Sequence, residues 1–152
     1  EYKYKSSYEQ IAKVIAQYSY VPLLDLTDFY EQVFFSWLVG NNDMHLKNFS
    51  LYAPKGKWFL TPAYDLLNVS MVNPKDTEEM ALTLNGRKKR ITKSDFVSAM
   101  TLSGIASKVF DNMLEKYRKL LPKFHSMIDM SFLDDECKEA YKQGITSRLE
   151  RI

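Results

Sequence analysis

The side chains best suited to chemistry stand together in one short polar stretch, GNNDMHLKNFS, at residues 40–50. Asp43, His45 and Asn48 supply a carboxylate, an imidazole and an amide, and Asn48 comes five positions after Asp43. A carboxylate can accept a proton from a reacting hydroxyl group, and carboxylate and amide oxygens are ligands for Mg²⁺. The stretch is therefore a candidate catalytic loop, provided that further ligands lie near it.

A second carboxylate, Asp65, comes 22 positions after Asp43, in the segment TPAYDLL at 61–67. Two short β-type runs, 49–52 and 58–61, lie between them and are separated by the turn-forming residues PKGK. Because a hairpin brings its two ends together, we expect the polar stretch and Asp65 to be neighbours in space. Asp43, Asn48 and Asp65 can then share one site, and we expect each of them to face a solvent-filled cleft.

Phosphoryl transfer requires such a set of groups. One carboxylate orients the attacking hydroxyl group and accepts its proton, while an amide oxygen and a second carboxylate hold Mg²⁺ against the phosphates of ATP. Protein kinases separate their loop Asp and Asn by the same five positions. The candidate catalytic residues are therefore Asp43, His45 and Lys47, and the candidate cofactor-binding and metal-binding residues are Asn48 and Asp65.

The roles of two of these residues stay less defined. We read His45 as a hydrogen-bonding residue that supports the loop, because Asp43 already fills the role of the base. Lys47 can offset charge on the transferred phosphoryl group or lie at the surface with its charge in water, and both readings stay open.

Taken together, the segments GNNDMHLKNFS at 40–50 and LTPAYDLL at 60–67 resemble the HipA-like serine/threonine kinases, the toxin kinases of bacterial toxin–antitoxin pairs. The resemblance covers most of the chain. It implies that Asp43 is the catalytic base and that Asn48 and Asp65 are Mg²⁺ ligands. It also implies ATP as the phosphate donor, a protein substrate in the translation machinery, and a small helix-turn-helix antitoxin as a partner. Relative to standard protein kinases, no His-Arg precedes Asp43, and Leu66-Leu67 stand where Phe-Gly would follow the second Asp.

The elements that must position these residues are mainly helices. Apolar residues recur at helical spacing at 8–18, behind the serines 6–7, and the stretch 25–38 is apolar on nearly every face. Further helices are predicted at 93–102, at 105–130 with a kink or break at Pro122, and at 133–152. A second hairpin is predicted from 80–84 and 90–92 around Asn85-Gly86. The expected fold is a single domain, 1–152, mainly α with two small β-hairpins, like the C-terminal lobe of a protein kinase.

A nucleotide-binding lobe is not evident in this sequence. The five glycines, at 40, 56, 86, 104 and 144, form no phosphate-covering loop. The sequence also opens at Glu1 without a methionine. We therefore expect a helical C-terminal lobe, with the N-terminal nucleotide lobe on an upstream part of the chain or on another polypeptide, and we expect the isolated fragment to be inactive.

Composition excludes several classes of protein. A net charge of +2 is too small for general nucleic-acid or membrane binding, and direct nucleic-acid binding is not expected. The basic run 87–90 is read as a solvated turn, although a contact with the antitoxin or substrate stays open. The single cysteine, Cys137, excludes an internal disulfide framework. The sequence has neither an apolar run of about 18 residues nor a signal segment, so we expect a cytoplasmic protein without membrane partners.

Three other functions have partial support in the sequence. A metallophosphoesterase is excluded because His45 and His125 are the only histidines, too few for the usual dinuclear site. A small-molecule phosphotransferase of the atypical kinase group is the second choice, because the loop motif does not define the acceptor. A non-catalytic, pseudokinase-like interaction module also stays open, since the nucleotide lobe is missing.

Overall fold

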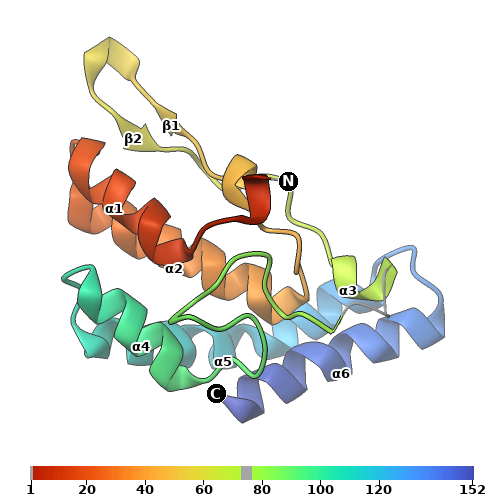
Figure 1. Cartoon of the computed structure of the whole chain (residues 1–152). Helices are drawn as coiled ribbons and strands as arrows, with labels where there is room; N and C mark the ends of the chain where they lie inside the picture. The colour runs from red at the N-terminus through yellow and green to blue at the C-terminus, as the bar shows by residue number, and fades with distance from the viewer. Residues whose placement is uncertain (1, 73–76) are drawn as a thin grey trace.

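The computed structural model describes residues 2–72 and 77–152, which form six α-helices and one two-stranded antiparallel sheet (Figure 1). The helices are α1 (Tyr8–Tyr18), α2 (Pro22–Val39), α3 (Val69–Val72), α4 (Lys93–Leu102), α5 (Ser107–Asp129) and α6 (Asp135–Arg151). The strands are β1 (Leu51–Tyr52) and β2 (Phe59–Leu60), and short 3-10 turns lie at Tyr2–Tyr4, Leu46–Asn48 and Pro54–Gly56. The mainly helical fold class is confirmed.

Helix α2 is the centre of the fold, as its all-round apolar sequence predicted. It packs against both α1 and α6, and its aromatic side chains are buried. Phe34 makes edge-to-face contacts with Phe96 of α4 and Phe110 of α5, with ring centroids 5.4 Å apart in each pair. Such contacts add specificity to the burial of apolar area. Pro22 occupies the first turn of α2, where a missing N–H costs nothing, so the helix starts three residues before the predicted Asp25.

Helix α2 ends at Gly40 because only glycine fits there. Gly40 has φ +80°, the left-handed conformation that ends many helices. A Cβ at this position would lie 2.4 Å from Ser70 Oγ and 2.8 Å from Asn68 Oδ1. The Ser70 N–H donates to the Gly40 carbonyl at 3.0 Å. The segment after Asp65 is therefore packed directly against the start of the polar loop.

Local capping signals define two other helices. The Ser7 hydroxyl oxygen accepts the Gln10 N–H at 3.3 Å at the start of α1. At the start of α4, the Asp95 carboxylate accepts the Thr92 N–H at 2.9 Å. Helix α4 begins and ends where the sequence predicted. Helix α5 runs through Pro122 without a break.

The hairpin predicted around Asn85-Gly86 is reduced to its turn, so the prediction of a second pair of strands is wrong. Asn85 and Gly86 have φ +50° and +75°, as a tight Asn-Gly turn requires, and Leu84 and Arg87 exchange backbone hydrogen bonds. The pairing does not extend, because Thr83 instead bridges to Ser7 at the start of α1. The turn itself lies at the surface, as expected for the basic run.

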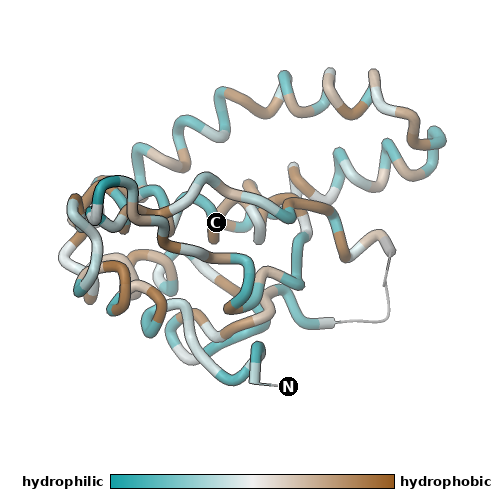
Figure 2. Tube along the Cα trace, turned by 90° about the horizontal axis from the view of Figure 1, so that it is seen from above, coloured by the Kyte–Doolittle hydropathy of each residue, from teal (hydrophilic) through white to brown (hydrophobic). Residues whose placement is uncertain are grey.

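The distribution of hydrophobic residues agrees with the way the helices pack. Figure 2 shows hydrophobic and hydrophilic positions alternating along the helical tubes, as expected for helices that each bury one face. No helix in the described ranges is long and apolar enough to cross a membrane.

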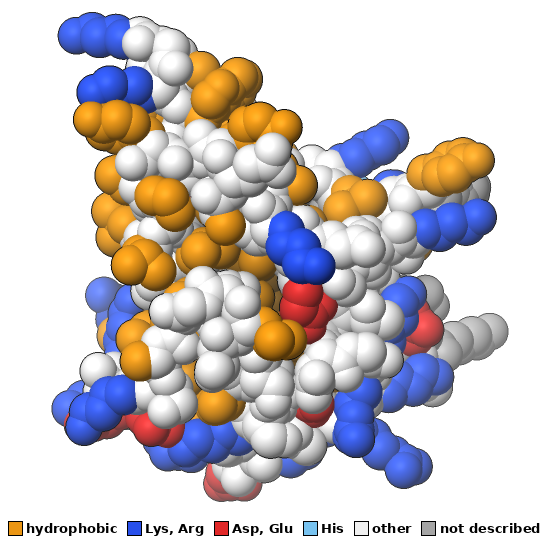
Figure 3. All heavy atoms as spheres, turned by 60° about the vertical axis from the view of Figure 1, so that its left-hand side comes forward, with side chains coloured by type: hydrophobic (Ala, Val, Ile, Leu, Met, Phe, Trp, Pro, Cys, Tyr) orange, Lys and Arg blue, Asp and Glu red, His pale blue; other side chains and the backbone are white. Residues whose placement is uncertain are grey.

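Hydrophobic side chains also gather on the face shown in Figure 3. On the hairpin side, Tyr20, Tyr52 and Trp58 are each about half exposed, and the rings of Tyr20 and Tyr52 both contact Phe59.

Candidate functional site

The polar loop that follows Gly40 is attached to the core through Met44. The Met44 side chain is fully buried, and its carbonyl oxygen accepts the hydroxyl group of Tyr8 at 2.9 Å. Tyr8 is itself buried, and burial raises the pKa of its hydroxyl group above the ordinary value, which keeps it a neutral donor. The loop is therefore held by one apolar anchor and one buried hydrogen bond from α1.

The hairpin brings Asp65 to the loop, as the sequence predicted. Asn48 Nδ2 donates to Asp65 Oδ2 at 2.6 Å, across a separation of 17 residues. Asn41 joins the two segments at a second point, because its amide donates to the Asp65 carbonyl at 3.1 Å and accepts the Asp43 N–H at 3.3 Å. The expected neighbourhood of Asn48 and Asp65 is confirmed.

Asp65 occupies an uncommon backbone conformation. Its φ is +57°, in the left-handed region that costs a non-glycine residue free energy, although Asp and Asn tolerate it better than most. The residue is exposed, so its carboxylate faces solvent on the side away from Asn48. Strain of this kind is retained where surrounding contacts fix the backbone, and here the bond from Asn41 does so.

Asp43 is half-buried at the edge of a cavity of about 480 Å³. One carboxylate oxygen, Oδ1, accepts the hydroxyl group of Tyr4 at 2.6 Å. The cavity is lined by Tyr4, Asn42, Asp43, Val69, Glu78, Ala81 and Lys88. Asn48 and Asp65 do not line it.

His45 is only 7% exposed and contributes to support of the loop. Its Nε2 lies 2.9 Å from the ammonium nitrogen of Lys3, and its ring packs edge-to-face on Tyr4 with centroids 5.3 Å apart. These contacts fit the supporting role that the sequence suggested better than a role as an acid or base.

Lys47 is exposed, and its ammonium group has no hydrogen bond or ion pair with any described residue. Its carbonyl oxygen accepts the hydroxyl group of Tyr64 at 2.9 Å, and Tyr64 also bonds Ser50 at 2.7 Å. The backbone at Lys47 is therefore fixed while its side chain is in solvent, which leaves both readings of Lys47 open.

The donor set fits Mg²⁺ in kind. Mg²⁺ prefers oxygen ligands and is commonly held by one or two protein groups with substrate phosphates completing its shell. Asp65 offers such a carboxylate beside the Asn48 amide. Within the described residues no group of three His, Cys, Asp or Glu side chains could hold a metal ion, so a cation here would need phosphate oxygens as well.

The Asn48 amide must turn to present its oxygen to a cation. In this structure Nδ2 faces Asp65, while Oδ1 accepts the His45 N–H at 2.9 Å. That N–H also donates to the Asp43 carbonyl at 2.9 Å. It therefore keeps a partner if the amide rotates, which makes the rotation less costly than leaving a buried donor unsatisfied.

Sequence reasoning missed three residues of this cluster. Lys3 and Tyr4 reach the loop from the N-terminal 3-10 turn, 42 and 39 positions away, and no local pattern predicts such a contact. Asn41 lies within the quoted polar stretch, so its presence was visible, but its bridging of Asp43 and Asp65 depends on the folded hairpin.

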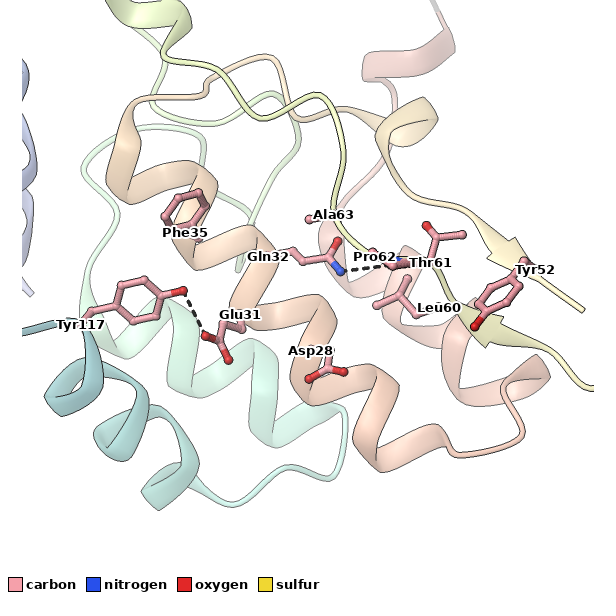
Figure 4. Close-up of a pocket in the computed structure, with 10 residues that line it drawn as sticks. All are labelled: Asp28, Glu31, Gln32, Phe35, Tyr52, Leu60, Thr61, Pro62, Ala63 and Tyr117. Carbon is pink, nitrogen blue, oxygen red and sulfur yellow. Dashed lines mark hydrogen bonds between the residues drawn. The ribbon is translucent and has the colours of Figure 1, made fainter. Parts of the chain in front are cut away.

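A larger cavity, of about 520 Å³, lies along α2 and does not include Asp43, Asn48 or Asp65 (Figure 4). It is lined by Asp28, Glu31, Gln32, Phe35, Tyr52, Leu60, Thr61, Pro62, Ala63 and Tyr117. Glu31 accepts the hydroxyl group of Tyr117 at 3.0 Å and pairs with Lys116, and Gln32 donates to the Thr61 carbonyl at 3.3 Å. Three of its polar side chains are thus engaged in structural contacts, so chemistry is better supported at the polar loop.

The chain is similar to known proteins along most of its length. A family model described as the HipA-like C-terminal domain matches residues 1–125. A Haemophilus influenzae protein named "Putative kinase" is 43% identical over 65 residues, which cover 42% of this chain and 19% of that protein. A Sinorhizobium fredii protein named "Putative kinase Y4dM" is 27% identical over 130 residues, which cover 84% of this chain and 31% of that protein. The chain therefore spans less than a third of the length of these curated relatives.

The fold has a counterpart among solved structures. A chain of the Shewanella oneidensis MR-1 toxin–antitoxin complex of HipA, HipB and operator DNA superposes with a TM-score of 0.80. The match covers 95% of this chain and 35% of that chain, at 22% identity. At this identity the likeness establishes a common fold.

Proposed function

This chain belongs to the family of HipA-like C-terminal domains, and we propose that it is the catalytic lobe of a serine/threonine protein kinase. In this proposal the γ-phosphoryl group of ATP is transferred to a Ser or Thr hydroxyl group of a protein. The observation that carries it is the contact of Asn48 with Asp65 at 2.6 Å, on a loop that also bears Asp43. Relatives named as kinases support the same class of reaction.

The proposed roles follow from the chemistry of each group. Asp43 orients the attacking hydroxyl group and accepts its proton, because it is a half-buried carboxylate beside a cavity that can admit a side chain, whereas Glu78, the other carboxylate of the lining, is paired with Lys88. Asn48 and Asp65 would hold Mg²⁺, which when bound neutralises charge on the nucleotide phosphates. His45 and the Tyr8–Met44 contact hold the loop in place.

The cavity beside Asp43 is the proposed site of the acceptor segment. Its lining is mixed, with the apolar Val69 and Ala81 beside the ion pair of Lys88 with Glu78, whose N and O atoms are 3.2 Å apart. A lining of small apolar and charged residues suits a polar protein segment that carries a hydroxyl group. Lys88 belongs to the basic run 87–90, which thereby borders the proposed acceptor site.

The wider setting is also a proposal. We expect a nucleotide-binding lobe outside residues 1–152 to supply the phosphate-covering loop, because this chain spans 31% of a relative that it matches along most of its length. The Shewanella complex contains HipA with HipB and operator DNA, so a helix-turn-helix antitoxin of the HipB type is the proposed partner. A substrate in the translation machinery and a cytoplasmic location complete the proposal.

Phosphorylation assays on the full-length polypeptide test this proposal. With ATP labelled on the γ-phosphate and Mg²⁺, we expect label on Ser or Thr of a protein acceptor or of the kinase itself. Label that appears only on a small molecule would favour the small-molecule phosphotransferase. Nucleotide binding without any transfer would favour the pseudokinase-like module.

A further inference from the structure

The N-terminal 3-10 turn, Tyr2–Tyr4, packs against the polar loop. Figure 1 shows this turn beside the 3-10 turn Leu46–Asn48, and the two are in contact. Lys3 and Tyr4 reach His45 and Asp43 at 2.9 and 2.6 Å. From this geometry we infer that Lys3 and Tyr4 are positioning residues of the phosphoryl-transfer site, Tyr4 acting through Asp43 and Lys3 through His45. The inference rests on the proposed function and adds residues to it.

Tyr4 fixes the orientation of the carboxylate that would act as the base. Its hydroxyl group donates its single proton to Asp43 Oδ1. The other oxygen, Oδ2, has no hydrogen bond to any described residue. Because one oxygen is held, rotation of the carboxylate is restricted while Asp43 lines the 480 Å³ cavity. A base must lie within hydrogen-bond reach of the proton it removes, so fixing its direction raises the fraction of productive encounters.

Lys3 fixes the imidazole of His45. An ammonium group has only N–H donors, so Nε2 of His45 is the acceptor in this contact, while Nδ1 is buried without a hydrogen-bond partner among the described residues. Tyr4 and the carboxylates of Asp43 and Asp65 raise the pKa of Lys3, which therefore stays charged at neutral pH. The same ammonium group lies 4.7 Å from the centre of the Tyr4 ring.

The two contacts form one unit. The Tyr4 ring contacts both the Lys3 ammonium group and the His45 ring, so a movement of the N-terminal turn would disturb both contacts. Tyr8 holds the same loop from α1 through the Met44 carbonyl, at a point between Asp43 and His45. The backbone of the loop is thus held by Tyr8 of α1, and the side chains of Asp43 and His45 are oriented by the turn that precedes α1.

Kinetics of the full-length protein test the inference for Tyr4. Tyr4→Phe keeps the ring that packs on His45 and removes only the hydroxyl group. We expect kcat to fall by between about tenfold and 100-fold, the scale of a misplaced catalytic group, while the KM for ATP stays unchanged. Tyr2→Phe is the matched control, since Tyr2 is 88% exposed and makes no contact with Asp43, and it should keep the kcat of the unmodified protein.

A comparison at Lys3 separates positioning from a general structural role. Lys3→Met should lower kcat, and Lys3→Arg should restore most of it because an N–H donor is regained. An unchanged kcat in Tyr4→Phe, or failure of Lys3→Arg to exceed Lys3→Met, would overturn the inference for that residue.

Nuclear magnetic resonance on the 152-residue chain reports on the contacts directly. We expect Lys3→Met to move the ¹⁵N shift of His45 Nε2, and Tyr4→Phe to move the ¹³C shift of the Asp43 carboxyl group. Unmoved shifts would refute the contacts whatever the kinetics. If the unmodified full-length protein transferred no phosphate, the proposed function would fail and the catalytic part of this inference with it. Normal transfer by Tyr4→Phe would instead leave the proposed function standing.

Discussion

Asn48 carries two structural bonds as well as its proposed role at the Mg²⁺ site. From the sequence we expect Asp43, Asn48 and Asp65 all to face a solvent-filled cleft, but Asn48 is only 3% exposed, so that expectation is wrong for this residue. Its amide oxygen and nitrogen bind the His45 N–H and the Asp65 carboxylate. A loop residue can therefore be a candidate ligand and also hold the backbone of the loop.

Asn48→Ala should destabilise the fold as well as weaken nucleotide binding. Removing the amide eliminates two hydrogen bonds at a buried position, so we expect the free energy of unfolding to fall by about 1–3 kcal/mol. Chemical denaturation of the 152-residue chain measures it. Asp65→Asn is the matched control, because Asn tolerates the positive φ and its amide oxygen still accepts from Asn48, so its stability should change by less than about 0.5 kcal/mol. Equal stability of the two variants would contradict this account.

At the scale of elements, the junction of α2 with the loop depends on Gly40. An alanine there would incur the left-handed backbone cost and would also meet Ser70 and Asn68. We expect Gly40→Ala to lower the free energy of unfolding by about 2–4 kcal/mol, from the backbone cost of about 1–2 kcal/mol plus overpacking.

Gly104→Ala isolates the contribution of the close contacts. Gly104 has φ +81°, nearly the same backbone conformation, but a Cβ added there would have no described atom within 4 Å beyond its chain neighbours. It should therefore lose only the backbone contribution of about 1–2 kcal/mol. Thermal or chemical denaturation of both variants gives the comparison, and a Gly104→Ala variant as unstable as Gly40→Ala would show that packing against Ser70 is unimportant.

Glu79 joins three elements through one carboxylate. It accepts hydrogen bonds from the two terminal nitrogens, Nη1 and Nη2, of Arg151 at the end of α6, at 2.9 and 2.8 Å. It also accepts the Trp37 indole N–H from α2 and the Ile91 N–H, each at 3.1 Å. Burial raises the pKa of Glu79, but the hydrogen bonds from Arg151, Trp37 and Ile91 outweigh it, and the net pKa is lowered from the ordinary 4.5.

This pKa predicts a dependence of stability on pH. Because the folded state holds Glu79 ionised below its ordinary pKa, the stabilisation is fully present above about pH 4.5 and is lost as pH falls through the lowered value. Glu79→Gln should cost about 1–2 kcal/mol at neutral pH, a value reduced by the partial exposure of Arg151. The difference between Glu79→Gln and the unmodified chain should shrink in acid. A difference that is constant from pH 7 to pH 3 would contradict the assignment.

Elements with local signals could be predicted from the sequence, and elements that depend on distant partners could not. Helix α4 has its capping residues Thr92 and Asp95 at its start and Gly104 just after its end, so both its ends were predicted. The second hairpin failed because Thr83 pairs with Ser7, a partner 76 positions earlier that no local pattern reveals. The site divides in the same way, since the Asn48–Asp65 contact follows from the first hairpin while Lys3 and Tyr4 arrive from elsewhere.

At the scale of the whole molecule, the proposed function requires the described residues to supply only one side of a nucleotide site. Asp65 is exposed, and the phosphate-covering loop of a kinase is not evident in the sequence. We expect the 152-residue chain to bind ATP with Mg²⁺ weakly, because most of the surface that encloses a nucleotide would come from the proposed N-terminal lobe. Calorimetry on the chain and on the full-length protein makes the comparison. Micromolar affinity for the chain alone would contradict the proposed division into lobes.

The most direct test of the proposed function is the behaviour of Asp43→Asn in the full-length protein, with phosphate transfer and nucleotide binding measured on the same preparation. An amide keeps the shape of the carboxylate and can still accept the Tyr4 hydroxyl group, but it cannot take up a proton from the attacking hydroxyl group. We therefore predict that transfer is abolished while the affinity for ATP with Mg²⁺ stays unchanged, so that binding and chemistry separate at this residue. Transfer at the rate of the unmodified protein would contradict the assignment of Asp43 as the base and, with it, the central claim that the polar loop is catalytic.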